Sequence, residues 1–142
     1  MFIREVMTPC PTHIEGSVLV SEAIYLMAEK GIRHLPVVDR NRLAGVLTER
    51  DAKLAQMIER AGGKPPTALD VCCRDPYVVF DDTDIAEVSK IMADRKLDYA
   101  LVADKNAGCV GILTTVDICR LVHLLYQEIR QEDLSGTPPN QH

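Results

Sequence analysis

The sequence has no tryptophan, and aromatic residues occupy only 4% of its 142 positions. It also has no basic excess, because 16 Lys and Arg residues stand against 21 Asp and Glu residues, for a formal net charge of −5. Proteins that bind nucleic acid usually present a basic surface, often with aromatic side chains on which bases stack. The composition therefore disfavours nucleic acid and acidic lipid as partners, although a local basic pocket stays possible.

The sequence lacks long apolar runs. None approaches the roughly 20 residues that a membrane-spanning helix requires. The N-terminus, residues 1–5 (MFIRE), has no apolar segment of the kind found in a signal peptide. We therefore expect a cytoplasmic protein of ordinary globular composition, with no membrane segment.

Cysteine is present but is not arranged for metal binding. The five cysteines are an odd number without a Cys-x-x-Cys pair, and the four histidines are scattered. Because metal sites need such ligands clustered at short spacing, no metal site is expected. Adjacent Cys72 and Cys73 could form a strained disulfide, but buried or idle thiols are the favoured alternative.

A seven-residue stretch occurs twice in the chain. Residues 45–51 (GVLTERD) reappear as 111–117 (GILTTVD), with the same offset at both ends (111 − 45 = 66 and 117 − 51 = 66). Each copy begins as a short apolar strand and ends in Thr-x-x-Asp, a capping box in which Thr takes the N-cap position of a helix. The unsatisfied N–H groups and positive dipole end of such a helix suit an anion or a hydroxyl-rich ligand.

The Thr-x-x-Asp tetrad has two interpretations. A single tetrad usually does no more than start a helix. Two copies in register, each preceded by a Gly-initiated strand, favour a binding role. Glycine lets a flat ligand approach the backbone closely, and a carboxylate at the start of a helix can accept hydrogen bonds from two neighbouring hydroxyls, as on a ribose.

The rest of the chain follows nearly the same period. Pro11 and Pro76 are 65 residues apart (76 − 11 = 65), and one additional loop residue changes the offset to 66. Apolar residues at positions i, i+3, i+4 and i+7 predict helices, and short apolar runs between them predict strands. The predicted helices begin near Ser17, Thr48, Asp84 and Thr115. Each half of the chain then has the order β-α-β-β-α.

The repeat predicts an α+β fold in which two β-α-β-β-α units pack sheet to sheet with pseudo-two-fold symmetry. We expect the first unit over residues 1–61, a linker over 62–66, the second unit over 67–131 and a disordered tail over 132–142. A unit of about 60 residues buries little surface by itself, so the two units should share a core, with clefts between their paired corners.

The last predicted helix, from about Thr115 to Gln131, carries more apolar residues than a short unit can cover. Its stripe consists of Ile118, Leu121, Val122, Leu125 and Ile129. A homodimer through these helices is the simplest way to cover the stripe. The alternative is that the helix folds back onto its own core.

The ordered pattern resembles the tandem pair of cystathionine-β-synthase-type (CBS) domains called a Bateman module. The resemblance depends on residues 31–39 (GIRHLPVVD) and 45–51 in the first half, and on 97–102 (LDYALV) and 111–117 in the second. It extends over about residues 1–131. It implies a regulatory module that binds adenosine-containing ligands in clefts between the units and signals to a partner protein, which is unknown.

The resemblance also implies the ligand. AMP, ADP or ATP would be a regulatory ligand and not an obligatory cofactor, with S-adenosylmethionine or NAD as alternatives. A structural or oligomerisation module with vestigial clefts is a further alternative. An enzyme is not expected, because the sequence shows no Ser/His/Asp arrangement, metal cluster, Gly-rich phosphate loop or catalytic carboxylate pair.

The family motifs map onto particular residues of this chain. The resemblance assigns the ribose hydroxyls to Asp51 and Asp117, with Thr48 and Thr114 beside them. It assigns phosphate contacts to Arg33, His34 and, more weakly, Arg50. It assigns the adenine to backbone and apolar groups at Thr12, His13, Ile14 and Val46 in one cleft and at Tyr77, Val78, Val79 and Ile112 in the other.

The second copy departs from this pattern at the basic positions. Asp98, Tyr99 and Val116 stand where the first copy has its candidate phosphate contacts. A carboxylate at close range repels phosphate. We therefore expect unequal clefts, one favouring a phosphorylated ligand and the other weaker or selective for a less charged one.

Overall fold

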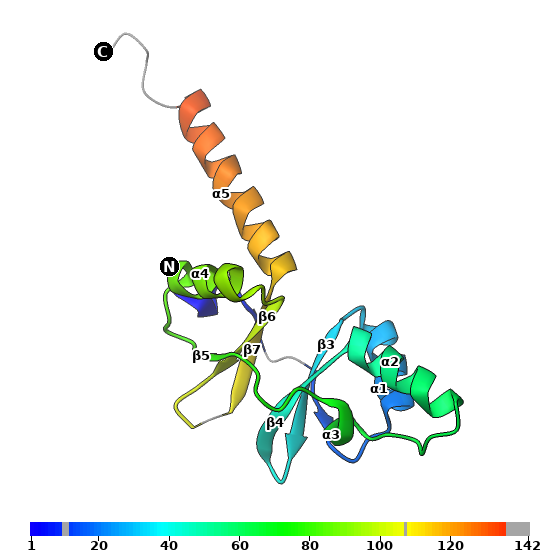
Figure 1. Cartoon of the computed structure of the whole chain (residues 1–142). Helices are drawn as coiled ribbons and strands as arrows, with labels where there is room; N and C mark the ends of the chain where they lie inside the picture. Colours follow the sequence, from blue (N-terminus) through cyan, green and yellow to red (C-terminus); the bar gives the residue numbers. More distant parts are fainter. Residues whose placement is uncertain (10–11, 107, 136–142) are drawn as a thin grey trace.

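The computed structural model describes residues 1–9, 12–106 and 108–135, in two units that each contain a sheet and helices (Figure 1). The first half contains η1 (Ile3–Glu5), β1 (Thr8–Pro9), β2 (Ile14–Glu15), α1 (Val20–Lys30), β3 (His34–Asp39), β4 (Arg42–Thr48) and α2 (Glu49–Arg60). The second half contains α3 (Ala68–Val71), β5 (Val78–Phe80), α4 (Ile85–Arg95), β6 (Tyr99–Ala103), β7 (Cys109–Thr114) and α5 (Thr115–Ser135).

The two units share a three-stranded topology, to which β1 adds a fourth strand in the second unit. In the described part of the chain, one sheet has the strand order β2-β3-β4 and the other the order β1-β7-β6-β5. In each, a parallel pair (β2 with β3, β5 with β6) adjoins an antiparallel pair (β3 with β4, β6 with β7). The predicted α+β fold with two β-α-β-β-α repeats is confirmed.

The units meet through apolar residues of both sheets. Val46 of β4 packs with Leu101 of β6 and Ile112 of β7, and the first two side chains are fully buried. Each unit also has a core of its own between its sheet and helices, around Leu47 in the first and Leu113 in the second. The shared cluster therefore joins two small cores, as the size of each unit requires.

The leading segment of each half packs on the opposite unit. Ile3 is fully buried in the second unit's core, and its N–H donates to the carbonyl of Thr83 at 2.8 Å. Ala68 is fully buried in the first unit's core, and its N–H donates to the carbonyl of Val18 at 2.7 Å. The unit boundaries proposed at residues 61 and 67 remain a prediction. They separate the two sequence copies, whereas the packing of Ile3 and Ala68 joins residues from both sides of them.

The sequence analysis did not anticipate the short helix α3. Its start is a capping box, in which Thr67 Oγ1 accepts from the Asp70 N–H at 3.3 Å and Asp70 Oδ2 accepts from the Thr67 N–H at 3.0 Å. This single helical turn directs the chain after the linker back onto the first unit. The sequence analysis did not anticipate η1 either, and α1 begins at Val20 and not near Ser17.

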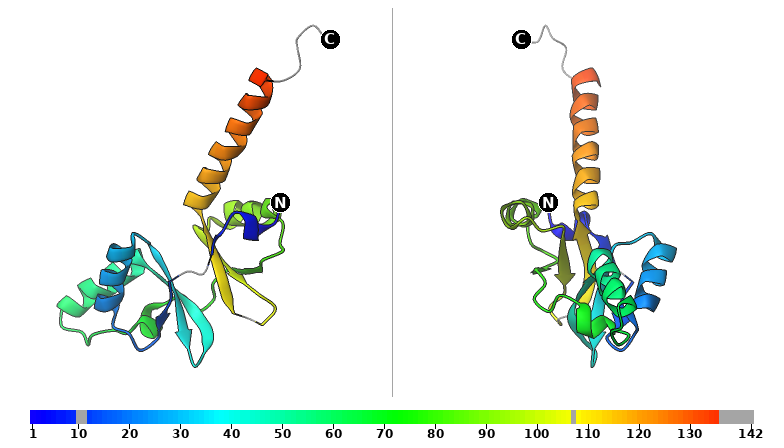
Figure 2. Two further views of the ribbon diagram at one scale, coloured as in Figure 1. Left: turned by 180° about the vertical axis from the view of Figure 1, so that it is seen from behind. Right: turned by 45° about the vertical axis from the view of Figure 1, so that its right-hand side comes forward.

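Helix α5 projects away from both units, as the views of Figures 1 and 2 agree. It is 21 residues long and continues to Ser135, beyond the Gln131 expected from the sequence. Apolar side chains along it are exposed, including Val122 (60%) and Ile129 (55%). The fold-back alternative is therefore wrong for Val122, Leu125 and Ile129, whereas Ile118, in the first turn of the helix, packs against the second unit's core. The rest of the predicted tail, residues 136–142, lies outside the described residues.

The two motif glycines predict a difference in stability. A Cβ at Gly45 would overlap the backbone carbonyl of Cys73, whereas a Cβ at Gly111 would meet the side chain of Met7. Backbone cannot yield as a methionine side chain can, so Gly45→Ala should lower the free energy of unfolding by about 1–3 kcal/mol or more, and Gly111→Ala by less. Urea unfolding of the two variants checks this order, and equal losses would contradict it.

Candidate functional site

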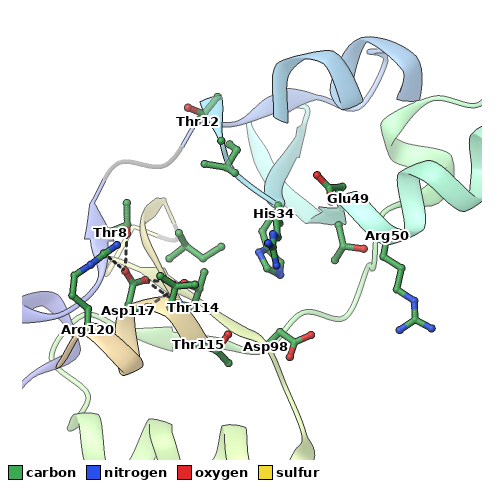
Figure 3. Close-up of a pocket in the computed structure, with 16 residues that line it drawn as sticks. Thr8, Thr12, His34, Glu49, Arg50, Asp98, Thr114, Thr115, Asp117 and Arg120 are labelled. Carbon is green, nitrogen blue, oxygen red and sulfur yellow. Dashed lines mark hydrogen bonds and ion pairs between the residues drawn. The ribbon is translucent and has the colours of Figure 1, made fainter. Parts of the chain in front are cut away.

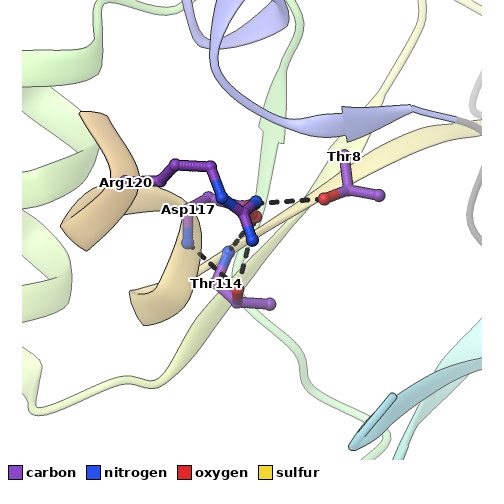
Figure 4. Close-up of polar contacts among 4 residues, drawn as sticks. All are labelled: Thr8, Thr114, Asp117 and Arg120. Atoms are coloured by element: carbon purple, nitrogen blue, oxygen red, sulfur yellow. Dashed lines mark hydrogen bonds and ion pairs between the residues drawn. The ribbon is translucent and has the colours of Figure 1, made fainter. Parts of the chain in front are cut away.

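The second repeated corner holds a buried carboxylate where β7 passes into α5 (Figure 4). Asp117 is 5% exposed, and its Oδ2 accepts from the backbone N–H of Thr114 at 2.9 Å and from the Thr114 hydroxyl at 3.3 Å. Thr114 Oγ1 in turn accepts from the Asp117 N–H at 3.4 Å. The Thr-x-x-Asp motif forms a complete capping box here.

Asp117 also connects separate parts of the chain. Its Oδ1 accepts from the hydroxyl of Thr8, on strand β1, at 3.1 Å and lies 3.5 Å from the NH1 of Arg120, one turn along α5. The partners of its two oxygens thus come from β1, β7 and α5. Such bonds offset the unfavourable desolvation of a buried carboxylate.

The first repeated corner, where β4 passes into α2, is more open. Thr48 Oγ1 accepts from the Asp51 N–H at 3.1 Å, so Thr48 is the N-cap residue that the motif predicts. Asp51 itself is exposed, and within the described residues its carboxylate has no hydrogen-bond partner. The same sequence motif therefore yields a bonded carboxylate in one unit and an available one in the other.

A cleft with a volume of ≈ 760 Å³ opens between the two units (Figure 3). The first unit lines it from the end of α1 to the start of β3 and at the start of α2. The second unit lines it from the end of β7 to the first turns of α5. This volume lies within the range of about 300–1,000 Å³ that is usual for small-molecule sites.

Charged side chains of both signs line the cleft. They are Arg33, Glu49, Arg50, Asp98, Asp117 and Arg120. In Figure 3 the side chains of Arg120 and Asp117 lie together at one side, whereas Arg50 extends away from them. A ligand with separate hydroxyl and anionic groups could therefore find acceptors and donors in one cavity.

His34 is half-buried in the cleft and contacts the ring of Tyr99, with the ring centroids 5.0 Å apart. Burial lowers the pKa of His34 below its ordinary value, while the charge of Asp98 opposes this effect and that of Arg33 adds to it. The neutral imidazole is thus favoured, and it can act as either donor or acceptor.

Tyr99 occupies the position in the second unit that His34 has in the first (99 − 34 = 65). Burial raises the pKa of Tyr99 to about 12, and the neighbouring Cys73 thiol and the charge of Asp51 act in the same direction. Burial also raises the pKa of the Cys72 thiol. Cys72 and Cys73 are both free, so this side of the unit interface presents a phenol and thiols near Asp51.

The cleft brings together 8 of the 15 residues that the sequence analysis proposed as ligand contacts. The predicted residues that line it are Thr12, Arg33, His34, Thr48, Arg50, Ile112, Thr114 and Asp117. They come from both units, so three of the four residues proposed for ribose and all three proposed for phosphate face one cavity, which Asp98 of the second copy also lines. Their roles as ligand contacts remain predictions.

The other proposed residues do not line this cleft: Asp51, His13, Ile14, Val46, Tyr77, Val78 and Val79. Among them, Ile14 and Val79 belong to the separate unit cores and Val46 to the shared cluster. Asp51 lies on the side of Tyr99 and Cys73. Any contact of these residues with an adenine also remains a prediction.

The sequence analysis missed Thr8 and Arg120 as residues of the cleft. Arg120 had a detectable signal, because it follows the motif aspartate by three residues and so lies on the same face of the predicted helix. Thr8 had no such signal. It meets Asp117 through the pairing of β1 with β7, a contact between residues 109 positions apart in the sequence.

The described residues contain no group of His, Cys, Asp and Glu side chains that could hold a metal ion. In the same part of the chain, no helix combines the length and apolar character that crossing a membrane requires.

The chain belongs to the CBS domain family, since the model of the CBS domain matches residues 3–57 and again 68–124. Among solved structures it is similar to a Vibrio cholerae protein described as AcuB (TM-score 0.80, 25% identity, 97% of this chain and 98% of that one). It is also similar to CBSX2 from Arabidopsis thaliana, a structure of which contains AMP (TM-score 0.74, 27% identity, 88% of this chain and 98% of that one). The tandem CBS pair is thereby confirmed.

Curated relatives include the inosine-5'-monophosphate dehydrogenase of Korarchaeum cryptofilum, 33% identical over 116 residues. The match covers 82% of this chain but 22% of that enzyme. The chain spans less than two thirds of the length of the first curated relatives that it matches. The dehydrogenase name therefore describes a protein most of which lies outside the similarity.

The two corners predict different effects of removing their carboxylates. Asp117→Ala should lower the free energy of unfolding by about 1–3 kcal/mol, because it deletes buried hydrogen bonds that connect β1, β7 and α5. Asp51→Ala keeps the Thr48 cap and should lower it by less than about 1 kcal/mol. Thermal or urea unfolding measures both. Equal losses would show that the buried network contributes nothing beyond the cap.

Proposed function

We propose that this chain is a regulatory module that binds AMP, ADP or ATP in the cleft between its units and signals to a separate partner protein. The observation that carries the proposal is the meeting, in one cavity, of the motif pair Thr114 and Asp117 with Arg33 and His34 of the other unit. The AMP complex of CBSX2, a family member 27% identical, supports the choice of ligand class.

Each part of a nucleotide has a chemically suitable partner in the cleft. The carboxylate of Asp117 can accept hydrogen bonds from ribose hydroxyls. Arg33, with His34 and Arg50, can donate to phosphate oxygens, and guanidinium groups do so with matching planar geometry. Thr12 and the apolar Ile112 remain for the base. This division of roles makes the cleft selective for a molecule that carries all three groups.

The second corner is proposed as an unequal site. Asp51 offers an exposed carboxylate for a diol, but the neighbouring groups are the phenol of Tyr99 and the thiol of Cys73, neither of which is a cation. A phosphate there gains little charge compensation. The corner would favour a less charged adenosine compound, S-adenosylmethionine among them, or would bind nucleotide weakly.

A nucleotide titration tests the main proposal. The unaltered chain should bind AMP, ADP or ATP saturably in isothermal titration calorimetry. Arg33→Ala should weaken AMP about tenfold or more, because a hydrogen bond to a charged group contributes about 1.5–3 kcal/mol. Arg60→Ala, which alters an exposed arginine at the end of α2 outside the cleft, is the matched control.

Two results would contradict the proposal. One is that none of these nucleotides binds, and that S-adenosylmethionine and NAD, tested beside them, do not bind either. The other is an equal affinity for AMP before and after the change at Arg33. The first result would favour the alternative of a structural or oligomerisation module with vestigial clefts.

We also propose that the chain forms a homodimer through α5. The exposed apolar side chains of this helix include Val122, Leu125, Tyr126 and Ile129, which share one face. Such a face is rarely left to water, and a two-fold axis lets the same face cover itself in a second copy. A ligand-dependent change at the cleft could reach the dimer, because α5 begins at Asp117's corner.

The dimer has its own test. Leu125→Glu combined with Ile129→Glu places charges on one face of α5, at i and i+4, and should convert the dimer to a monomer in sedimentation velocity. Gln127→Glu adds a charge on the opposite face and should leave the dimer intact. Monomeric sedimentation of the unaltered chain, or dimers of the double variant, would contradict the proposal.

A further inference from the structure

Arg120 lies in the cleft but is weakly held. Within the described residues its polar partner is Asp117, with NH1 and Oδ1 3.5 Å apart and the arginine side chain 66% exposed. That distance is at the limit of a hydrogen bond, and exposed ion pairs contribute little to stability. The guanidinium has five N–H donors, so most of its capacity to donate hydrogen bonds is available to a ligand.

Asp117 does not depend on this arginine. Its Oδ2 accepts from the Thr114 N–H at 2.9 Å, and its Oδ1 accepts from the Thr8 hydroxyl at 3.1 Å, both shorter than the contact to Arg120 (Figure 4). Moving the guanidinium away would therefore leave both oxygens bonded. The arginine can rotate toward another anion without exposing a buried, unsatisfied carboxylate.

We propose that Arg120 selects nucleoside phosphates over nucleosides in this cleft, by exchanging Asp117 for a phosphate group of the ligand. This inference rests on the proposed nucleotide function. Ribose hydroxyls that donate to Asp117 displace the guanidinium from Oδ1. A phosphate on the same ligand then supplies the displaced cation with a new anionic partner. A nucleoside displaces Arg120 from Asp117 but has no phosphate to pair with the guanidinium, so it binds less favourably.

The other corner lacks both parts of this device. The counterpart of Arg120 is Leu54 (120 − 66 = 54), which cannot pair with Asp51. The counterpart of Thr8 is Cys73, since Thr8 pairs with Ile112 and Cys73 pairs with Val46, the same position one repeat earlier (112 − 46 = 66). Exchange of an arginine between carboxylate and phosphate is thus a property of the Asp117 corner.

The test compares AMP with adenosine by isothermal titration. Every protein in this test carries Asp51→Ala, which removes the diol acceptor of the other corner. The measured affinity is then that of the Asp117 cleft. Arg120→Leu copies the residue of the first unit. It should weaken AMP about tenfold or more, the effect expected for a lost charge-assisted hydrogen bond, and leave adenosine unchanged or bound more tightly.

Two further variants complete the test. Arg120→Lys keeps the charge without the planar guanidinium. Its affinity for AMP should lie between that of the chain with Arg120 and that of Arg120→Leu. Arg130→Leu, an exposed arginine on the same helix outside the cleft, should change neither ligand. Thermal unfolding verifies that each variant is folded.

The outcomes separate the two proposals. A changed ratio of AMP to adenosine affinity supports the role of Arg120. An unchanged ratio, whether both affinities fall together or neither falls, overturns that role and leaves the nucleotide function standing. Binding of neither ligand by the chain that retains Arg120 overturns the nucleotide function itself.

Discussion

The packing of Val46 against Leu101 and Ile112 positions everything else in the molecule. Val46 and Ile112 come from β4 and β7, the strands that end in the two Thr-x-x-Asp corners, so the contact that joins the sheets also sets where both corners lie. Each unit alone is too small to bury much apolar surface, and the shared cluster makes the pair the stable unit. A cleft bordered by both units follows from this geometry, because the helices cover the outer faces and leave the strand ends open.

The crossed leading segments strengthen the same arrangement. Ile3 inserts into the second unit and Ala68 into the first, so each half is held by a segment of the other. Asp117 extends this connection into the cleft through Thr8, whose strand pairs with β7. A ligand bound at Asp117, as proposed, would therefore act on a group that already connects β1, β7 and α5.

The duplication preserves the backbone more closely than the chemistry. Both corners have the same strand-to-helix turn and the same threonine cap, yet one carboxylate is buried and bonded while the other is exposed. The difference comes from residues outside the motif, since a hydroxyl and a guanidinium accompany Asp117 where a thiol and an aliphatic side chain occupy the matching positions. Membership of the CBS family therefore indicates the fold, whereas the polar surroundings of each corner depend on these neighbours.

The sequence by itself determined the repeat, the order of elements, the two caps and the apolar stripes, because these depend on local spacing and on side-chain type. It also identified Arg33, His34, Thr114 and Asp117, which the fold then gathered in one cleft. The tertiary structure alone decided that Thr8 meets Asp117, that the halves exchange their leading segments and that α5 projects away from both units. Those features arise from contacts between residues far apart in the sequence, and no local periodicity records which distant segments will pair.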